Sequence, residues 1–172
     1  MQPSGYGKTT LFRLLAGLEK PEQKCSLSGF SSVTYMFQED RLLEKESTIH
    51  NILLPKLGVY GISTSKKLEL VEACEDIIKS GLLSEEALFD TAGTLSGGMK
   101  RRVALLRTML YEDKKDSLCL LDEPFTGMDE KTRAKAIEFI KEKQNGRTII
   151  LATHNEEDVL LLGGVLWKPE LH

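Results

Sequence analysis

The stretch Pro3-Ser4-Gly5-Tyr6-Gly7-Lys8-Thr9-Thr10 runs directly into Leu11-Phe12-Arg13-Leu14-Leu15 and predicts a phosphate-binding loop that opens a helix. In such a loop, glycines let successive backbone N–H groups turn towards a polyphosphate, a lysine contacts the terminal phosphates and a hydroxyl binds Mg²⁺. These groups are present here as Gly5, Gly7, Lys8 and Thr9. The pattern G-x-x-x-x-G-K-[ST] also begins with a glycine, and this chain has Gln2 at that position.

A phosphate-binding loop normally follows a buried strand that anchors it. Only Met1 precedes Gln2 in this sequence. Two interpretations stay open: the true start lies upstream, or the chain lacks the N-terminal strands and must hold its loop without them. We therefore expect the strands before the loop to be missing from this chain.

Length, net charge and cysteine content exclude several classes of protein. A chain of 172 residues can form one core, or one core with a small appended lobe. The net charge of −3 gives no broad basic field, so we expect no nucleic-acid partner, and we interpret the basic cluster Lys100-Arg101-Arg102 as a solvated helix face. Cys25, Cys74 and Cys119 are odd in number and far apart, which argues against a disulfide framework and favours a reducing, cytoplasmic setting.

The most apolar run, residues 159–167, is far shorter than the about 20 residues that span a bilayer. No signal peptide precedes the phosphate-binding loop. If the protein works at a membrane, another chain must hold it there.

Strand and helix patterns alternate along much of the chain. Apolar spacing predicts a helix over 9–18 with Leu11, Leu14, Leu15 and Leu18 on one face, and alternation predicts a strand that ends at Phe37 and delivers Gln38. Further on we expect a helix over 98–111, a buried strand over 117–121, a helix over 130–144 with Ala134, Ile137 and Ile140 inward, and a second buried strand over 148–152. Alternation of this kind predicts an α/β fold with a parallel sheet flanked by helices.

Residues 44–93 differ in character, with polar helix formers around apolar positions at helical spacing. A helix over 65–80 is expected to bury one side, formed by Leu68, Val71, Cys74 or Glu75, and Ile78. We interpret 44–93 as a small helical lobe inserted into a core formed by 1–43 and 94–172.

An acidic pair, Asp122-Glu123, follows the apolar strand 117–121 and precedes Pro124. Parallel sheets bind their ligands at the carboxyl ends of strands. Asp122 is suited to hold Mg²⁺, which takes few carboxylates and keeps several waters. Glu123 is suited to orient or deprotonate an attacking water. The alternative is an ordinary acidic turn after a strand, which the presence of a phosphate-binding loop disfavours.

Two further stretches have both a functional and a structural interpretation. Ser96-Gly97-Gly98 fits a helix start that attracts an anion, or simply a capped helix after a loop. Thr153-His154 follows the strand 148–152, which places an imidazole at the ligand edge of the sheet, although a lone histidine is more often a surface residue.

Together these motifs identify a family. Behind the phosphate-binding loop, in order, stand Phe37-Gln38, Leu95-Ser96-Gly97-Gly98-Met99, Leu120-Leu121-Asp122-Glu123-Pro124, Thr126-Gly127-Met128-Asp129 and Thr153-His154. The chain resembles the ATP-binding cassette ATPases over essentially its whole length. Met99 and Met128 depart mildly from the glutamine and leucine that are commoner there.

The resemblance implies ATP and Mg²⁺ as cofactors and a role for each motif. It makes Ser4 to Thr10 (Ser4, Gly5, Tyr6, Gly7, Lys8, Thr9 and Thr10) the phosphate and magnesium site, with Thr9, Gln38 and Asp122 at the metal. It makes Glu123 the general base, His154 the switch histidine and Gln38 the residue that couples the site to a membrane partner. It also implies that Ser96, Gly97, Gly98 and Asp129 act across a head-to-tail dimer, closing over the ATP of a second subunit.

Phe37-Gln38-Glu39-Asp40-Arg41-Leu42-Leu43 resembles the same loop of nitrate, sulfonate and taurine importer ATPases. This implies an ATP-hydrolysing subunit that energises import of a small solute, held at the inner face of the cell membrane by permease subunits and served indirectly by a solute-binding protein. The segment between Gln38 and Ser96 has no sustained heptads, which excludes the coiled-coil branch of the family. The alternative function is a truncated, catalytically impaired cassette that acts as a weak nucleotide- or partner-binding module or survives as a gene remnant.

Overall fold

The computed structural model describes residues 7–22, 28–57, 67–111 and 114–167. Its centre is a parallel sheet of β1 (Ser32–Met36), β2 (Ser117–Asp122) and β3 (Thr148–Ala152), in the order β1-β2-β3. The register pairs Met36 with Leu121 and Leu121 with Leu151, so the three carboxyl ends lie at one edge. The predicted α/β class with a parallel sheet is confirmed.

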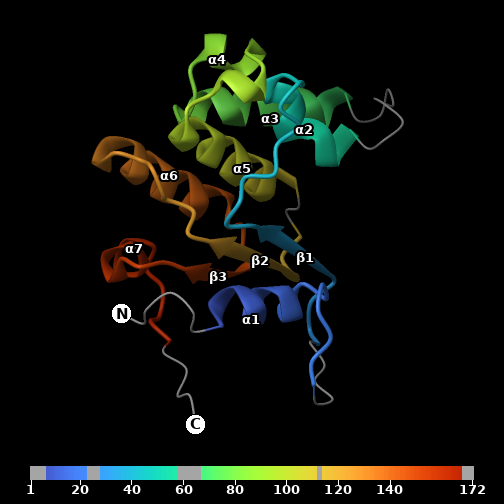
Figure 1. Ribbon diagram of the computed structural model, residues 1–172, viewed down its shortest axis with the longest axis vertical. Coiled ribbons are helices and arrows are strands. Elements are labelled where there is room, and N and C mark those ends of the chain that lie inside the picture. Colours follow the sequence, from blue (N-terminus) through green and yellow to red (C-terminus); the bar gives the residue numbers. More distant parts are fainter. Residues whose placement is uncertain (1–6, 23–27, 58–66, 112–113, 168–172) are drawn as a thin grey trace.

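Helices cover both faces of this sheet (Figure 1). In chain order they are α1 (Lys8–Leu15), α2 (Thr48–Leu57), α3 (Lys67–Ser80), α4 (Glu85–Phe89), the short 3₁₀ turn Ala92–Thr94, α5 (Gly97–Tyr111), α6 (Glu130–Lys143) and α7 (Glu156–Leu161). Figure 1 places α1 on one side of the sheet, and α5 and α6 on the other. The sheet therefore has helices on both of its faces.

The strand β2 is buried along its whole length. Its alternate side chains point to opposite faces: Leu118 and Leu120 join a cluster with Phe12 of α1, whereas Cys119 and Leu121 join the larger core that includes α5 and α6. A continuous apolar run is what burial on both faces requires. The strand was predicted on this ground, and the structure confirms it.

Two predictions near the sheet were wrong. The helix predicted over 9–18 ends at Leu15, before a left-handed Gly17, so Leu18 lies outside α1 and is exposed; the buried residue of α1 is Phe12. β3 is a strand as predicted, but only Ala152 is buried. Among the described residues β3 pairs on one edge alone, and it borders a cavity of about 450 Å³ that Val159 and residues 162–167 also line.

The inward faces of two helices also differ from the predictions. Among the side chains of α3 that the structure describes, residues 71–80, Ala73 and Ile77 are buried, while Val71 and Ile78 are about half exposed. In α6, Ala134 is exposed and Ala136 is buried beside Ile137 and Ile140. Both helices carry apolar residues over a wide arc, so spacing alone does not decide which part of the arc meets the core.

Helices α2, α3 and α4 occupy the segment that was interpreted as an inserted lobe. Their buried residues, such as Ile52 and Ile77, belong to the same cluster as Leu106 of α5 and Ile140 of α6. The helical character of 44–93 therefore agrees with the sequence where it is described. The division into core and inserted lobe stays a prediction.

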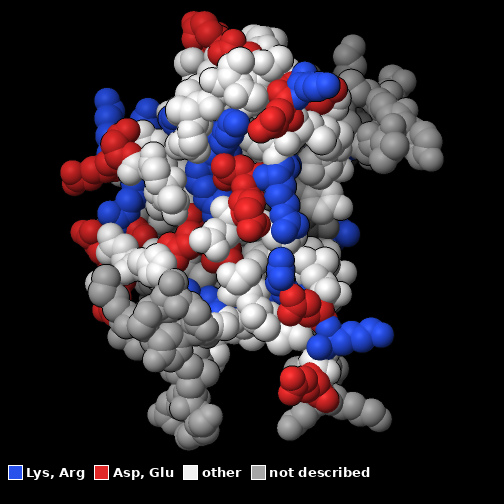
Figure 2. Space-filling model, viewed as in Figure 1, with Lys and Arg blue, Asp and Glu red and all other residues white. Residues whose placement is uncertain are grey.

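Charged side chains of both signs are interspersed over the face in Figure 2. Ion pairs such as Arg41 with Glu39 and Lys100 with Glu44 accompany this pattern. Within the described ranges, no helix is long and apolar enough to cross a membrane. Cys25, Leu68 and His172 lie where nothing is described of the side chain.

A pair of substitutions tests the inward face of α3. Ile77 is fully buried, and Ile77→Ala leaves a cavity that should lower the free energy of unfolding by about 2–4 kcal/mol. Ile78, its neighbour on the same helix, is 47% exposed, and Ile78→Ala should change it by about 0.5 kcal/mol or less. Urea unfolding measures both. A larger loss for Ile78→Ala than for Ile77→Ala would contradict the packing described here.

Candidate functional site

The helix α1 starts at a glycine that the backbone geometry requires. Gly7 precedes the first helical residue with φ 71° and ψ 9°, a left-handed conformation that a side chain disfavours. The first-turn N–H groups of α1 have no acceptor within the helix and favour an anion at this end. Lys8, Thr9 and Thr10 form this first turn. Ser4, Gly5 and Tyr6, predicted for the same loop, lie outside the described residues, as does Gln2.

Asp122 ends β2 directly beside this turn. Its carboxylate Oδ2 accepts a hydrogen bond from Thr9 Oγ1 at 3.2 Å and another from the Tyr35 hydroxyl at 3.3 Å, and the residue is 2% exposed. Burial and the negative charge of Asp122 raise the pKa of Tyr35 to about 12, so this hydroxyl stays a donor. Tyr35 lies in the strand predicted to end at Phe37, and no role at the site was predicted for it. Its register beside Leu120 is the reason it reaches Asp122.

Glu123 occupies a left-handed backbone conformation, φ 50°, where the chain leaves β2. Its amide donates to the carbonyl of Ala152 on β3 at 2.8 Å. Its carboxylate Oε1 lies 3.3 Å from Lys8 Nζ and 3.0 Å from His154 Nε2. The structure thus gathers a cation, a carboxylate and an imidazole from three elements far apart in the sequence.

The oxygens at this point fit Mg²⁺. Thr9 and Asp122 offer one hydroxyl and one carboxylate, which are hard ligands of the kind this ion takes, and their small number leaves positions for water and phosphate oxygens. Within the described part of the chain, no group of three His, Cys, Asp or Glu side chains is arranged to hold a metal by itself. The donor set suits an ion that arrives with a phosphorylated ligand.

The turn that carries His154 is anchored by its neighbours, while the imidazole ring stays accessible to solvent. The imidazole is 55% exposed, and the preceding Thr153 Oγ1 donates to Asp158 Oδ2 at 2.8 Å. Asp158 is buried and also pairs with Arg133 of α6. The turn after β3 is therefore anchored to α6 and α7, which directs the ring towards Glu123.

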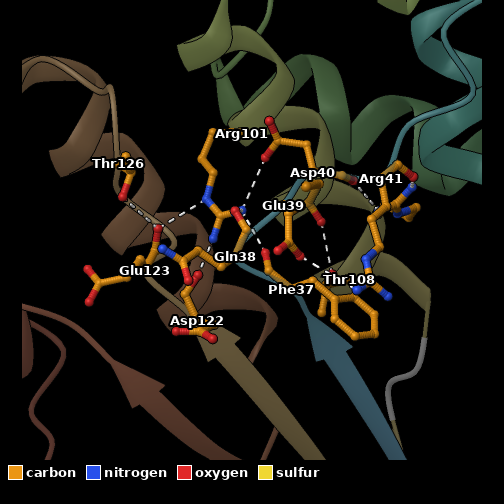
Figure 3. Close-up of polar contacts among 12 residues, drawn as sticks. Phe37, Gln38, Glu39, Asp40, Arg41, Arg101, Thr108, Asp122, Glu123 and Thr126 are labelled. Atoms are coloured by element: carbon orange, nitrogen blue, oxygen red, sulfur yellow. Dashed lines mark hydrogen bonds and ion pairs between the residues drawn. The ribbon is translucent and has the colours of Figure 1, made fainter. Parts of the chain in front are cut away.

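Gln38 lies just past the end of β1, and its residue is exposed. Its carbonyl accepts a hydrogen bond from Arg101 Nη1 at 3.0 Å (Figure 3). Arg101 is only 3% exposed, so the interpretation of Lys100-Arg101-Arg102 as a wholly solvated face was wrong for Arg101. Main-chain carbonyls of segments distant in the sequence surround this guanidinium. The spacing of residues along α5 does not predict these contacts.

The remaining predicted residues form a second group at the starts of α5 and α6. Ser96 Oγ accepts from Met99 N at 3.3 Å, and a Cβ on Gly98 would lie 2.4 Å from the carbonyl of Gly127. Asp129 is the N-cap of α6, and its hydrogen bonds from Thr132 lower its pKa. Gly97 borders open space. Among the described residues, the recorded contacts of Ser96, Gly97, Gly98 and Asp129 do not reach Lys8 or Glu123.

Known proteins resemble this chain over most of its length. A formylaminopyrimidine import ATP-binding protein, ThiZ, of Halalkalibacterium halodurans is 38% identical over 172 residues, which is 95% of this chain and 64% of that protein. An aliphatic sulfonates import ATP-binding protein, SsuB 1, of Rhodococcus jostii is 36% identical over 167 residues, which is 93% of this chain and 62% of that protein. The chain thus spans somewhat less than two thirds of the length of these relatives.

The fold has known counterparts. The dimeric structure of MJ0796, a bacterial ABC transporter cassette, superimposes with a TM-score of 0.75 at 24% identity and covers 92% of this chain and 75% of that one. The same cassette in a post-hydrolysis state bound to ADP and Pi gives 0.74 at 23% identity, with the same coverage. The family model described as ABC transporter matches residues 2–126. With these matches and the motif order seen in the sequence, the chain belongs to the ABC transporter family.

Proposed function

We propose that this chain binds ATP with Mg²⁺ and hydrolyses it, as the ATPase subunit that energises a membrane transporter importing a small solute. The observation that carries the proposal is the meeting of Lys8, Thr9, Asp122, Glu123 and His154 at one edge of the sheet. A helix start with free N–H groups, a lysine, a hydroxyl and a carboxylate together suit a polyphosphate. Glu123 adds the base that hydrolysis requires.

Each residue has a distinct role in this proposal. The first turn of α1 and Lys8 bind phosphate oxygens. When phosphate is bound, the amine of Lys8 contacts its oxygens in place of the Glu123 carboxylate. That exchange leaves Glu123 free to orient a water and accept its proton, while His154, 3.0 Å from Glu123, holds the carboxylate in place. Thr9 and Asp122 would hold Mg²⁺, which neutralises charge on the phosphates when it is bound.

The second group supports a role for a second subunit. Ser96 and Gly97 are exposed, and the space next to Gly97 is open, so another molecule has room to approach this helix start. We assign Ser96, Gly97, Gly98 and Asp129 to the ATP of a second cassette in a head-to-tail dimer. The structure of the MJ0796 cassette is a dimer, which is compatible with this assignment.

The importer assignment rests on the relatives, which are import ATP-binding proteins. In this proposal permease subunits hold the chain at the cytoplasmic face of the membrane, and a solute-binding protein acts through them. Gln38, exposed at the end of β1, couples the site to the permease and completes the metal site. The core of 1–43 and 94–172 binds ATP, and 44–93 is the inserted lobe.

Nucleotide binding and hydrolysis can be separated by two substitutions. Lys8→Ala removes the phosphate contact and should abolish both ATP binding and hydrolysis. Glu123→Gln keeps the shape but removes the base, so ATP binding should persist while kcat falls about 100-fold or more. Phosphate release and fluorescent-nucleotide binding measure the two properties. If the wild type and Lys8→Ala hydrolyse ATP equally slowly, the proposal that this chain is an ATPase is rejected. If the wild type still binds nucleotide in that case, the alternative function as a nucleotide-binding module is favoured.

Adjacent glycines test the dimer. Gly98→Ala places a methyl group against the Gly127 carbonyl and should lower the free energy of unfolding by about 1–3 kcal/mol. Gly97→Ala enters open space and should leave unfolding unchanged within about 1 kcal/mol, yet it should block ATP-dependent dimerisation. Light scattering in a Glu123→Gln background, where ATP persists, measures the association. Full dimerisation of Gly97→Ala would refute the assignment of Gly97 to the partner's nucleotide.

A further inference from the structure

Arg101 connects two segments that leave the sheet side by side. The first, here called the Gln38 segment, is residues 37–41 after β1, and the second, the Glu123 turn, is residues 122–126 after β2. Strand pairing between β1 and β2 ends at Met36 and Leu121, so the ladder does not join these segments beyond that point. Figure 3 shows the guanidinium of Arg101 lying between them.

The guanidinium donates to both segments. Nη1 donates to the carbonyls of Phe37 at 2.7 Å and Gln38 at 3.0 Å, and it pairs with Asp40 Oδ1 at 3.1 Å. Nε donates to the carbonyl of Glu123 at 3.0 Å, and Nη2 donates to the carbonyl of Asp122. Arg101 is 3% exposed, so its buried donors depend on these acceptors for their partners.

The contact with Glu123 is to the main chain, not to the carboxylate. Glu123 has a left-handed backbone, which costs free energy and persists only where its surroundings hold it. The Ala152 carbonyl holds its amide, while Arg101 and Thr126 hold its carbonyl. Arg101 thus helps to decide where the carboxylate of Glu123 projects.

A second arginine of α5 offers an internal comparison. Arg107 Nη2 donates to the carbonyl of Asp40 at 2.7 Å, and Nη1 donates to the carbonyl of Arg41 at 3.0 Å. Both contacts are within the Gln38 segment. Arg107 therefore stabilises one of the two segments, whereas Arg101 joins them.

We propose that Arg101 is a positioning residue that makes the Gln38 segment and the Glu123 turn move as one unit, so that a displacement of Gln38 is transmitted to the general base. The proposal rests on the function assigned to Glu123 above. It goes further by naming the side chain through which the two segments are coupled.

Hydrogen exchange tests the coupling without relying on activity. Exchange in the full chain is followed by mass spectrometry for peptides covering 37–43 and 122–128, which include the hydrogen-bonded amides of Leu43 and Glu123. Arg101→Gln should speed exchange in both peptides, and Arg107→Gln, the matched control, only in the first. Faster exchange in only one peptide for Arg101→Gln, or in both for Arg107→Gln, would overturn the proposal.

Kinetics distinguish positioning from a purely structural role. Arg101→Gln should lower kcat about 10- to 100-fold, with nucleotide affinity within about threefold of wild type, because a small misplacement of a base costs rate and not binding. Arg101→Lys, which keeps the charge and three donors, should recover part of kcat. Gln38→Ala combined with Arg101→Gln should lower kcat less than the product of the single effects.

Other results of these experiments would contradict the proposal or the function on which it rests. An Arg101→Gln protein that is less stable but turns over like wild type, or strictly multiplicative effects with Gln38→Ala, would overturn the proposal. If Arg101→Gln does not fold, Arg101→Lys carries the same measurements. If wild type hydrolyses ATP no faster than Lys8→Ala, the proposed function fails, and hydrogen exchange still decides whether Arg101 couples the segments.

Discussion

The burial of β2 on both faces and along both edges is the constraint on which the rest of the site depends. Phe12 of α1 covers one face, α5 and α6 cover the other, and β1 and β3 pair with the two edges. Packing on both faces and pairing on both edges fix the position of the last residues of β2. Asp122 and Glu123 are therefore held at the edge of the sheet where α1 begins, and the hydroxyl of Thr9 and the amine of Lys8 meet them there.

The polar groups that leave this apolar strand need partners. The carboxylate of Asp122 is satisfied by two hydroxyl donors, and the carboxylate of Glu123 by Lys8 and His154. The charged groups of the site thus pair with one another. In the function proposed above, a bound polyphosphate would replace the carboxylate as the partner of Lys8, which would link binding of the substrate to release of the base.

Helix α5 joins the two groups of predicted residues. It begins at Gly97, next to the exposed Ser96, and one turn later Arg101 contacts the segments that follow β1 and β2. A helix is stiff over such a short distance. A second molecule that bound at Gly97 would therefore act on the same rigid element that positions Glu123, which gives the proposed dimer a physical route to the site.

Local sequence patterns identified most helices and strands and the motif residues. Contacts between elements decided which residues are buried and which partners they have. The strand 117–121 was predicted from its continuous apolar run, and Lys8, Thr9, Asp122, Glu123 and His154 from their places in motifs. Ala134 was wrongly predicted to face the core, because the choice between apolar arcs on a helix depends on what packs against it. The burial of Arg101 and the contact of Tyr35 with Asp122 were not predicted for a related reason, since the partners of both residues lie on other elements.

The sequence by itself determined the family, the alternation of strands and helices, and the identity of the chemical groups, because these depend on short-range spacing and residue type. Only the tertiary structure decided which groups meet. Parallel pairing brings Asp122 beside Thr9 and Tyr35, and packing of α5 buries Arg101 between the segments after β1 and β2. Pairing and burial of this kind involve residues more than 60 positions apart, such as Arg101 and Gln38, and no local pattern encodes them.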